Sequence, residues 1–337
     1  MRAAAFTELT GPDGVTIVER PTPEPGPGEA VVDVEACAIN RHDLWILEGD
    51  SAMVEADDLP FVSGLDVAGE VRTVGAGVTG VEPGDGVVLC PNETCGTCRF
   101  CRDGPENLCE SFSLHHGGLA EAACVEADRL VALPESVDTT TAAALPTAYM
   151  TAYRMLRLAN VGPTDLVFVP GATGGVGVAS VQLADVFGAR TIGTSSSAAK
   201  LERVDSLGLD HAVQGTDPDS LRTAVGNVGT PDAVLNHLGG RYTELGLDVL
   251  RRGGRMIVCG RTADSRSEID VPDLFLGHKR ITGSTMGTQG DLRTLVELVA
   301  AGDLTPEIAG TYPLDGTRNA FAAMRNRESV GKLVVTN

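Results

Sequence analysis

The sequence predicts an α/β protein of two domains, one mostly β and one built on a doubly wound parallel sheet. The chain has 337 residues, which exceeds the length at which a single hydrophobic core usually stops growing. Before Pro134, short β-type runs alternate with turns rich in glycine and proline, and beyond it apolar runs alternate with helical segments. These two patterns are typical of the two architectures.

The region before Pro134 is expected to form a compact β domain. Its apolar runs end in sequences such as PTPEPGPGE and VEPGDG. Such glycine- and proline-rich segments indicate strands joined by tight turns. The expected strands cover residues 15–18, 30–34, 67–74, 86–89 and 120–125.

The region after Pro134 is expected to form repeated β–α units, which imply parallel strands with crossover helices. A helix-compatible stretch over 139–158 leads into the first of the apolar runs. The expected strands cover residues 166–169, 191–194, 212–213, 232–235, 255–259 and 281–284. Beyond them we expect a helix from about Leu292, another around Ala320, and a last strand over 332–335.

The charge balance excludes some classes of partner. The chain carries 46 acidic and 26 basic residues, and only three of the basic ones are lysines. Nucleic acid and anionic membranes need a basic footprint, so we expect neither as a partner. No apolar stretch is long enough to span a membrane, and the start lacks the pattern of a signal peptide, so we expect a cytoplasmic protein. The acidic excess suggests a salt-loving host, where counterions would screen the self-repulsion.

Four cysteines predict a structural zinc lobe within residues 90–110. In this segment Cys95, Cys98 and Cys101 are spaced two residues apart and Cys109 follows after seven more. Such spacing lets thiolates converge on one tetrahedral ion, and four sulfur ligands leave no position open for water. Unrelated thiols and a redox CxxC pair are the alternatives, but neither needs all four cysteines. The other cysteines resemble ordinary buried thiols, with Cys37 the one in doubt.

A glycine-rich loop predicts a dinucleotide site. The run 166–169 continues into GATGGVG, which contains Gly171, Gly174, Gly175, Val176 and Gly177, and a helix follows. In this position glycines let the backbone approach a pyrophosphate, and the helix N-terminus offers N–H donors. A ligand-free glycine turn is the alternative, and the strand–loop–helix context speaks against it.

The segment after the next strand indicates NADP(H) as the cofactor. Sites for NAD hold an acidic residue here that binds the ribose 2′-hydroxyl. This chain instead has Ser195, Ser196 and Lys200, whose hydroxyl and ammonium groups suit a 2′-phosphate. The alternative is that Lys200 is only a surface residue of the following helix.

Several further motifs lie at positions spread over nearly the whole chain. They are GEVRTVG at 69–75, PGD at 83–85, GGLAE at 117–121 and GKLVV at 331–335. Together with the cysteine lobe and the glycine loop, they resemble the zinc-containing alcohol dehydrogenase and quinone reductase superfamily of medium-chain dehydrogenases/reductases.

The resemblance implies a fold and an assembly. It implies a GroES-like catalytic domain formed by residues 1–147 and 288–337, and a Rossmann nucleotide-binding domain over 148–287. It also implies a homodimer or homotetramer, often joined through the strand expected at 281–284.

The resemblance also exposes a departure at the catalytic metal. Zinc alcohol dehydrogenases of this superfamily place a cysteine where we align Asn40, a histidine where we align Leu65, and a cysteine or acid near Thr147. None of these ligands is present. Asn40 is similar instead to the asparagine of quinone and enoyl reductases, which work without a metal. The resemblance therefore implies a structural zinc combined with a metal-free active site.

Four side chains are candidates for the reaction site. Reduction of an activated alkene or quinone needs a donor for the developing oxyanion, and Asn40 could offer its amide N–H. His42 could relay a proton, because imidazole titrates near neutrality. By resemblance, Thr151 lines the nicotinamide and Arg41 reaches the pyrophosphate. Three of them have a structural alternative: Asn40 could cap a turn, His42 could pair with Asp43, and Arg41 could form a surface ion pair.

Three hypotheses for function follow. The leading one is an NADPH-dependent reductase of a small-molecule quinone, enone or related carbonyl compound. The second is an alcohol or sugar dehydrogenase with an irregular catalytic zinc held by Cys37, His42 and Asp66, a chemically permissible set. The third is a non-enzymatic NADPH-binding protein on the same fold.

Overall fold

A computed structural model describes all residues from 1 to 337, which form two compact units. The first consists of Met1–Thr147 and Thr288–Asn337, and the second of Ala148–Gly287. We describe each unit by itself. No helix in either unit combines the length and apolar character needed to cross a lipid bilayer.

The first unit is mostly β. Its strands are β1 (Arg2–Phe6), β2 (Val15–Glu19), β3 (Glu29–Ala38), β4 (Phe61–Val62), β5 (Asp66–Val74), β6 (Gly86–Leu89), β7 (Asn92–Glu93), β8 (Ser113–Leu114), β9 (Ala122–Glu126), β10 (Leu130–Ala132), β17 (Ile308–Pro313) and β18 (Lys332–Thr336). Its α-helices are α1 (Arg41–Leu47), α2 (Arg99–Asp103), α3 (Thr139–Ala143), α10 (Gln289–Ala301) and α11 (Thr317–Arg325).

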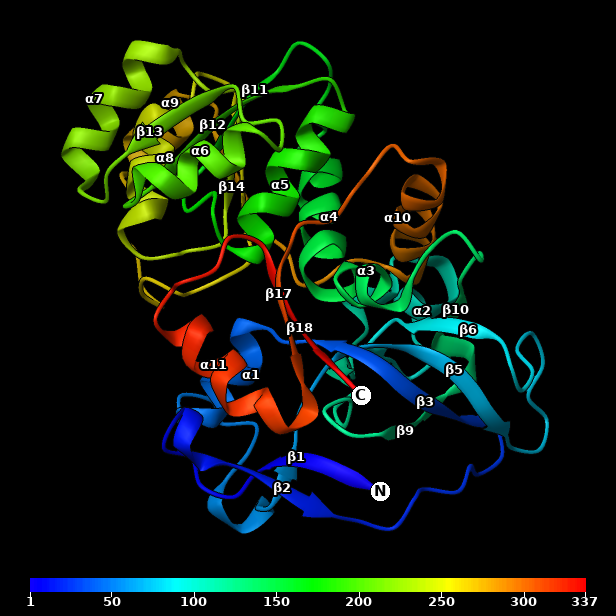
Figure 1. The fold of residues 1–337 in the computed structure, drawn as a ribbon. Helices are drawn as coiled ribbons and strands as arrows, with labels where there is room; N and C mark the ends of the chain where they lie inside the picture. The colour runs from blue at the N-terminus through cyan, green and yellow to red at the C-terminus, as the bar shows by residue number, and fades with distance from the viewer. The chain divides into compact units, whose positions relative to one another are not determined.

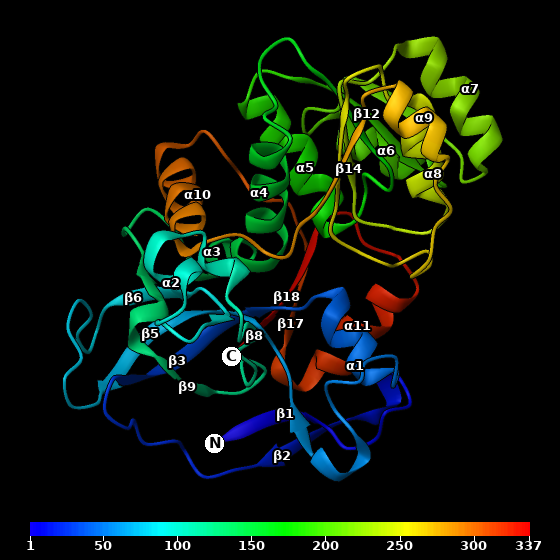
Figure 2. The ribbon, with the colours of Figure 1, turned by 180° about the vertical axis from the view of Figure 1, so that it is seen from behind.

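The long strand β3 organises this unit. It pairs antiparallel with β5, β9 and β18 within a seven-stranded sheet, whose main order is β10-β6-β5-β3-β18-β17 (Figure 1 and Figure 2). A separate three-stranded sheet has the order β2-β1-β4. The two sheets and α11 enclose an apolar core in which the rings of Phe6 and Phe321 meet edge to face at 5.6 Å. The register of β3 brings Ala38 opposite Asp66 on β5 and Val334 on β18.

The second unit is a doubly wound α/β domain, as the sequence predicts. Its strands are β11 (Leu166–Val169), β12 (Arg190–Ser195), β13 (His211–Gln214), β14 (Ala233–Asn236), β15 (Arg255–Val258) and β16 (Arg280–Gly283). Its helices are α4 (Met150–Leu158), α5 (Gly175–Val186), α6 (Ala198–Asp205), α7 (Pro218–Val228), α8 (Arg241–Val249) and α9 (Val271–Leu276).

All six strands of this sheet run parallel, in the order β13-β12-β11-β14-β15-β16. The order reverses between β11 and β14, which is the switch point where open α/β sheets bind ligands. Helices α4 and α5 pack together, as do α7 and α8 (Figure 1).

The helix expected over 139–158 is interrupted, which corrects that prediction. The chain forms α3, then a π-helical turn over Leu145–Tyr149, and then α4. Pro146 lies in this turn and has no N–H to continue a regular helix. The backbone N–H of Thr147 donates instead to a carboxylate oxygen of Asp66, at 3.0 Å. Single π-turns of this kind often mark functional sites.

Candidate functional site

The glycine loop has the geometry of a diphosphate cradle. It joins β11 to α5 at the switch point of the parallel sheet. Gly171 has φ +73°, and a Cβ on Gly177 would lie 2.3 Å from the Gly171 carbonyl oxygen, so both positions require glycine. A Cβ on Gly174 would meet nothing within 4 Å. The loop therefore leaves open space in front of the N-terminus of α5, which fits a pyrophosphate group.

The segment after β12 presents hydroxyl groups near this loop. Ser195 is the last residue of β12 and is buried, with its Oγ 3.4 Å from the Thr173 Oγ1. Ser196 is exposed, and Ser197 caps α6 by accepting from the backbone N–H of Lys200. Hydroxyl groups follow the strand where an acidic residue would bind an NAD ribose. This arrangement fits a cofactor that carries a 2′-phosphate.

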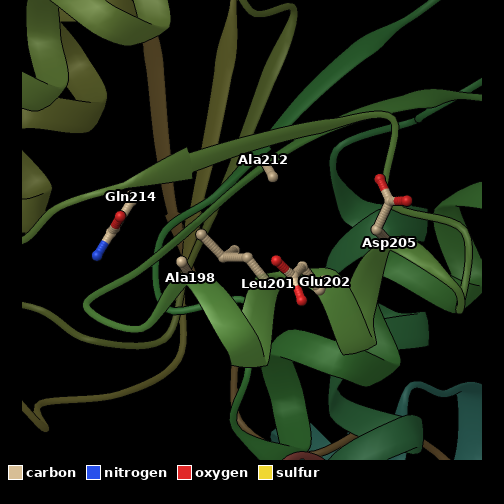
Figure 3. Close-up of a pocket in the computed structure, with 6 residues that line it drawn as sticks. All are labelled: Ala198, Leu201, Glu202, Asp205, Ala212 and Gln214. Carbon is tan, nitrogen blue, oxygen red and sulfur yellow. The ribbon is translucent and has the colours of Figure 1, made fainter.

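A surface groove of about 380 Å³ borders the same helix (Figure 3). It lies between α6 and β13 and is lined by Ala198, Leu201, Glu202, Asp205, Ala212 and Gln214. Two carboxylates and no cationic group line it, so it does not suit a phosphate.

His237 is a candidate that sequence reasoning missed. It directly follows β14 at the carboxyl edge of the sheet, and its Nδ1 is buried without a hydrogen-bond partner. Burial lowers its pKa to about 4, so the ring is neutral at physiological pH. A Cβ on Gly171 would lie 3.3 Å from the His237 Nε2, so the ring lies beside the glycine loop. Its place directly after a strand of the parallel sheet was the available signal.

Thr151, expected to line the nicotinamide, is a buried residue of α4. Its hydroxyl lies 4.0 Å from the sulfur of Met286. Its role toward a cofactor stays a prediction.

A buried polar network occupies the other candidate site, in the first unit. Asp66 is fully buried at the start of β5. Its Oδ2 accepts from the Asn40 Nδ2 at 2.9 Å and from the Lys332 Nζ at 3.0 Å. Its Oδ1 accepts from the backbone N–H and the hydroxyl of Thr147. Burial raises the pKa of Asp66, and the charge of Lys332 opposes that shift.

Lys332 is the member of this network that sequence reasoning did not single out. It is the first residue of β18 and is 3% exposed. Its Nζ also donates to the carbonyl oxygen of Ile39 at 3.1 Å and to the Oδ1 of Asn40. The available signal was the rarity of lysine in this chain.

The network changes the interpretation of Asn40. This residue is the N-cap of α1, as its structural alternative proposed. One amide hydrogen is donated to Asp66 and the other points to the carbonyl oxygen of Ala38, at 3.4 Å. Because both hydrogens are engaged, the geometry does not support Asn40 as the donor to a substrate oxyanion.

The structure does not bring the irregular zinc set together. Cys37, His42 and Asp66 are not among the groups whose ligand atoms lie within 4.8 Å of one another. Both oxygens of Asp66 already accept hydrogen bonds. Burial, followed by the charge of Asp43, raises the pKa of the Cys37 thiol well above its usual value and opposes the thiolate that zinc needs.

Three histidines, one of them in α1, have a ring nitrogen without a hydrogen-bond partner. The Nε2 atoms of His42, His115 and His116 are all buried without a partner. The rings of His42 and His116 stack at a centroid distance of 5.4 Å, and Phe61 meets His116 at 5.1 Å. Burial lowers the pKa of His116 to about 4, so it is neutral at physiological pH.

Hydrogen bonds orient the His116 ring. Ser63 donates its hydroxyl hydrogen to the Asp43 Oδ1 at 2.6 Å, and both residues are fully buried. The Ser63 Oγ lies 3.4 Å from the His116 Nδ1. Since the only hydroxyl hydrogen of Ser63 is used, this contact requires the hydrogen on Nδ1. The Nε2 of His116 then carries a lone pair that can accept a proton.

Arg41 has the chemistry of an anion contact. It is the first residue of α1, and its Nε is buried without a partner. Burial, and then the nearby charge of Arg327, lowers its pKa. Two neighbouring guanidinium groups with an unsatisfied N–H suit a phosphate or diphosphate.

The cysteine lobe fits a structural metal. The ligand atoms of Cys95, Cys98, Cys101 and Cys109 all lie within 4.8 Å of one another. Hydrogen bonds, led by the backbone N–H of Thr97, lower the pKa of Cys95 to about 6 and favour its thiolate. Four convergent sulfurs match the closed tetrahedral set of a structural zinc site.

Two domain families match the chain. The family described as "Alcohol dehydrogenase GroES-like domain" matches residues 26–135. The family described as "Zinc-binding dehydrogenase" matches residues 175–301.

Similar proteins include both dehydrogenases and reductases. An alcohol dehydrogenase of Moraxella sp. is 31% identical, with 99% of each chain covered. An acryloyl-coenzyme A reductase of Metallosphaera sedula is 30% identical, with 96% of each chain covered. Among solved structures, a 2-octenoyl-CoA carboxylase reductase in complex with NADP and 2-octenoyl-CoA superimposes with a TM-score of 0.91 at 26% identity, covering 99% of this chain and 87% of that one.

We predict one zinc per chain, held by the cysteine lobe, because only this set of ligand atoms converges. Replacing Cys98 with serine removes one thiolate, so the zinc content should fall toward none and the lobe should unfold at a lower temperature. Elemental analysis and thermal unfolding measure both effects. Cys124→Ser, at a thiol outside the lobe, should leave both unchanged. Two zincs per chain, or a Cys98→Ser protein that keeps its zinc, would contradict the prediction.

Proposed function

The chain belongs to the medium-chain dehydrogenase/reductase superfamily, and we propose that it is an NADPH-dependent reductase of α,β-unsaturated carbonyl compounds that uses no catalytic metal. The observation that carries this proposal is the network around Asp66. Asn40 and Thr147, at two positions where zinc dehydrogenases hold their ligands, both bind this carboxylate. Leu65, at the third position, is fully buried and apolar. These residues offer a divalent ion no ligand set.

Each unit, taken by itself, offers groups suited to parts of the cofactor. In the second unit, the glycine loop would receive the pyrophosphate, and Ser195, Ser196 and Lys200 the 2′-phosphate. In the first, Arg41 has an unsatisfied Nε that suits an anionic group, as the resemblance implies for the pyrophosphate. When bound, reduced NADP supplies a hydride to the substrate.

The histidine pair would supply the proton that completes a reduction. A hydride added to one end of the conjugated system leaves an enolate, which must gain one proton to give the saturated carbonyl compound. His42 is the proposed donor, because its Nε2 is buried and unpartnered and its ring stacks on His116. His116 stays neutral beside it, which avoids two adjacent positive charges.

A second candidate is alcohol oxidation with the same residues. It is favoured by His116, which the Ser63–Asp43 chain orients with its lone pair on Nε2. A neutral buried imidazole suits the removal of a proton from an alcohol. Similarity to the Moraxella alcohol dehydrogenase also favours this direction.

We predict that NADPH binds at least about tenfold more tightly than NADH, or about 1.4 kcal/mol, because no acidic residue follows β12. Ser195→Asp should move the preference toward NADH, because a carboxylate repels a 2′-phosphate. Fluorescence titration of both cofactors tests this. Ser206→Asp, an exposed position just after α6, adds the same charge and should leave the preference unchanged. Equal affinities for the wild-type protein would overturn the assignment.

We predict that the protein oxidises NADPH with enones, enoyl thioesters or quinones faster than with simple aldehydes or ketones. His42→Gln should lower kcat by about 100-fold, with a smaller change in KM. His211→Gln, on β13, is the matched control and should behave as wild type. Turnover limited to alcohols and their carbonyl products would favour the second candidate. Cofactor binding without turnover of any of these compounds would indicate a non-enzymatic role.

We propose that the protein forms a dimer through β16. This strand is an edge of the parallel sheet and is largely exposed. Beside it, Val271, Phe275 and Leu276 of α9 are each 60% exposed. An exposed edge strand next to an apolar patch promotes aggregation unless another chain covers it. A second copy can pair the same edge antiparallel across a two-fold axis.

Phe275→Glu should therefore convert a wild-type dimer into monomers, since a carboxylate would be buried in the interface. Sedimentation equilibrium over a range of concentrations measures the change. Met53→Glu alters a similarly exposed residue of the first unit and should leave the dimer intact. A wild-type protein that is monomeric at all concentrations would rule the proposal out.

A further inference from the structure

We propose that the ammonium group of Lys332 is an internal cation that takes the place of a catalytic metal. It neutralises Asp66, orients Asn40 and closes the site against divalent ions. The inference concerns how the site is built, and it holds for any substrate of the proposed reaction.

The first support is the complete coordination of the ammonium. Lys332 has three N–H donors, and three acceptors surround its Nζ: the Ile39 carbonyl oxygen, the Asn40 Oδ1 and the Asp66 Oδ2. All three come from segments that meet at one end of β3 and β5. The Lys332 side chain is only 3% exposed, and all three of its N–H donors have an acceptor, as expected for a buried polar group in a fixed position.

The second support is the balance of charge. Asp66 is fully buried, and its other donors, Asn40 and Thr147, are neutral. Lys332 is its one ion-pair partner. The other ionisable groups that act on this region, Asp43 and Cys37, are acids and cannot replace the cation. A buried carboxylate without a counter-charge is strongly destabilising, so the network needs one positive charge at this point.

The third support is the position of that charge. Lys332 contacts Asn40 directly and contacts Thr147 through Asp66. These residues lie where zinc dehydrogenases place metal ligands. The Asn40 amide bridges the pair, with its oxygen on the ammonium and its nitrogen on the carboxylate. The oxygens that a metal ion would need are used, and a divalent ion there would be repelled by the ammonium.

Zinc content gives the first test, and it does not depend on turnover. The triple variant Asn40→Cys, Leu65→His, Thr147→Cys restores the three ligand types. With Lys332 in place it should still hold one zinc per chain, and with Lys332→Met added it should hold two. A second zinc in the triple variant, or none added in the quadruple variant, overturns the proposal. Neither result bears on which substrate is reduced.

Chemical rescue gives the second test and needs only one substitution. Lys332→Ala should unfold roughly 10 °C below wild type, because Asp66 loses its counter-ion. Methylammonium chloride should restore much of this shift, since it supplies a small cation with N–H donors. Tetramethylammonium chloride at the same concentration has no such donor and should not.

Lys332→Met is the matched control, because its side chain fills the space and leaves no room for an added amine. It should be destabilised but not rescued, and wild type should respond equally to both salts. If Lys332→Ala unfolds at the wild-type temperature, or if both salts restore it equally, Lys332 is not serving as the required cation.

Discussion

The buried ion pair between Lys332 and Asp66 is the contact on which the first unit depends. It joins the start of β18 to the start of β5, and its hydrogen bonds reach the end of β3 and the π-turn near Thr147. Removing either charge would leave the other buried and uncompensated, which commonly costs several kcal/mol. The same pair fixes Asn40 at the N-terminus of α1, so the position of His42 beside it follows from this interaction.

Features carried by short stretches of sequence could be predicted. The glycine loop, the strands of the parallel sheet and the spacing of the zinc-lobe cysteines all lie within a few residues of one another, so local chemistry identifies them. The strand β1, with the sequence RAAAF, was not predicted, because alanine has little intrinsic preference for strands. It forms because β2 and β4 pair with it on both sides.

The network around Asp66 could not be predicted, because it depends on distant partners. Asn40 is 26 residues from Asp66 and 292 residues from Lys332 along the chain. The sequence identified Asn40 as unusual for its position but could not show that its amide was already engaged. Two of the three lysines in the chain share one pattern of contacts. Lys279 and Lys332 each donate to a backbone carbonyl and to an aspartate, a compact geometry for which an ammonium is suited and the planar guanidinium of arginine is not.

The place of β18 in the chain has a consequence for synthesis. The first unit is discontinuous: most of it precedes residue 148, but Lys332 follows the whole of the second unit. On the ribosome, the nucleotide-binding unit is fully translated before the last strand emerges, so it can fold while the β unit still lacks its central cation. Asp66 therefore lacks its counter-charge until Lys332 has been translated. The network around Asp66 can form only after β18 has emerged, and a chain truncated before Lys332 would retain the glycine loop but lose that network.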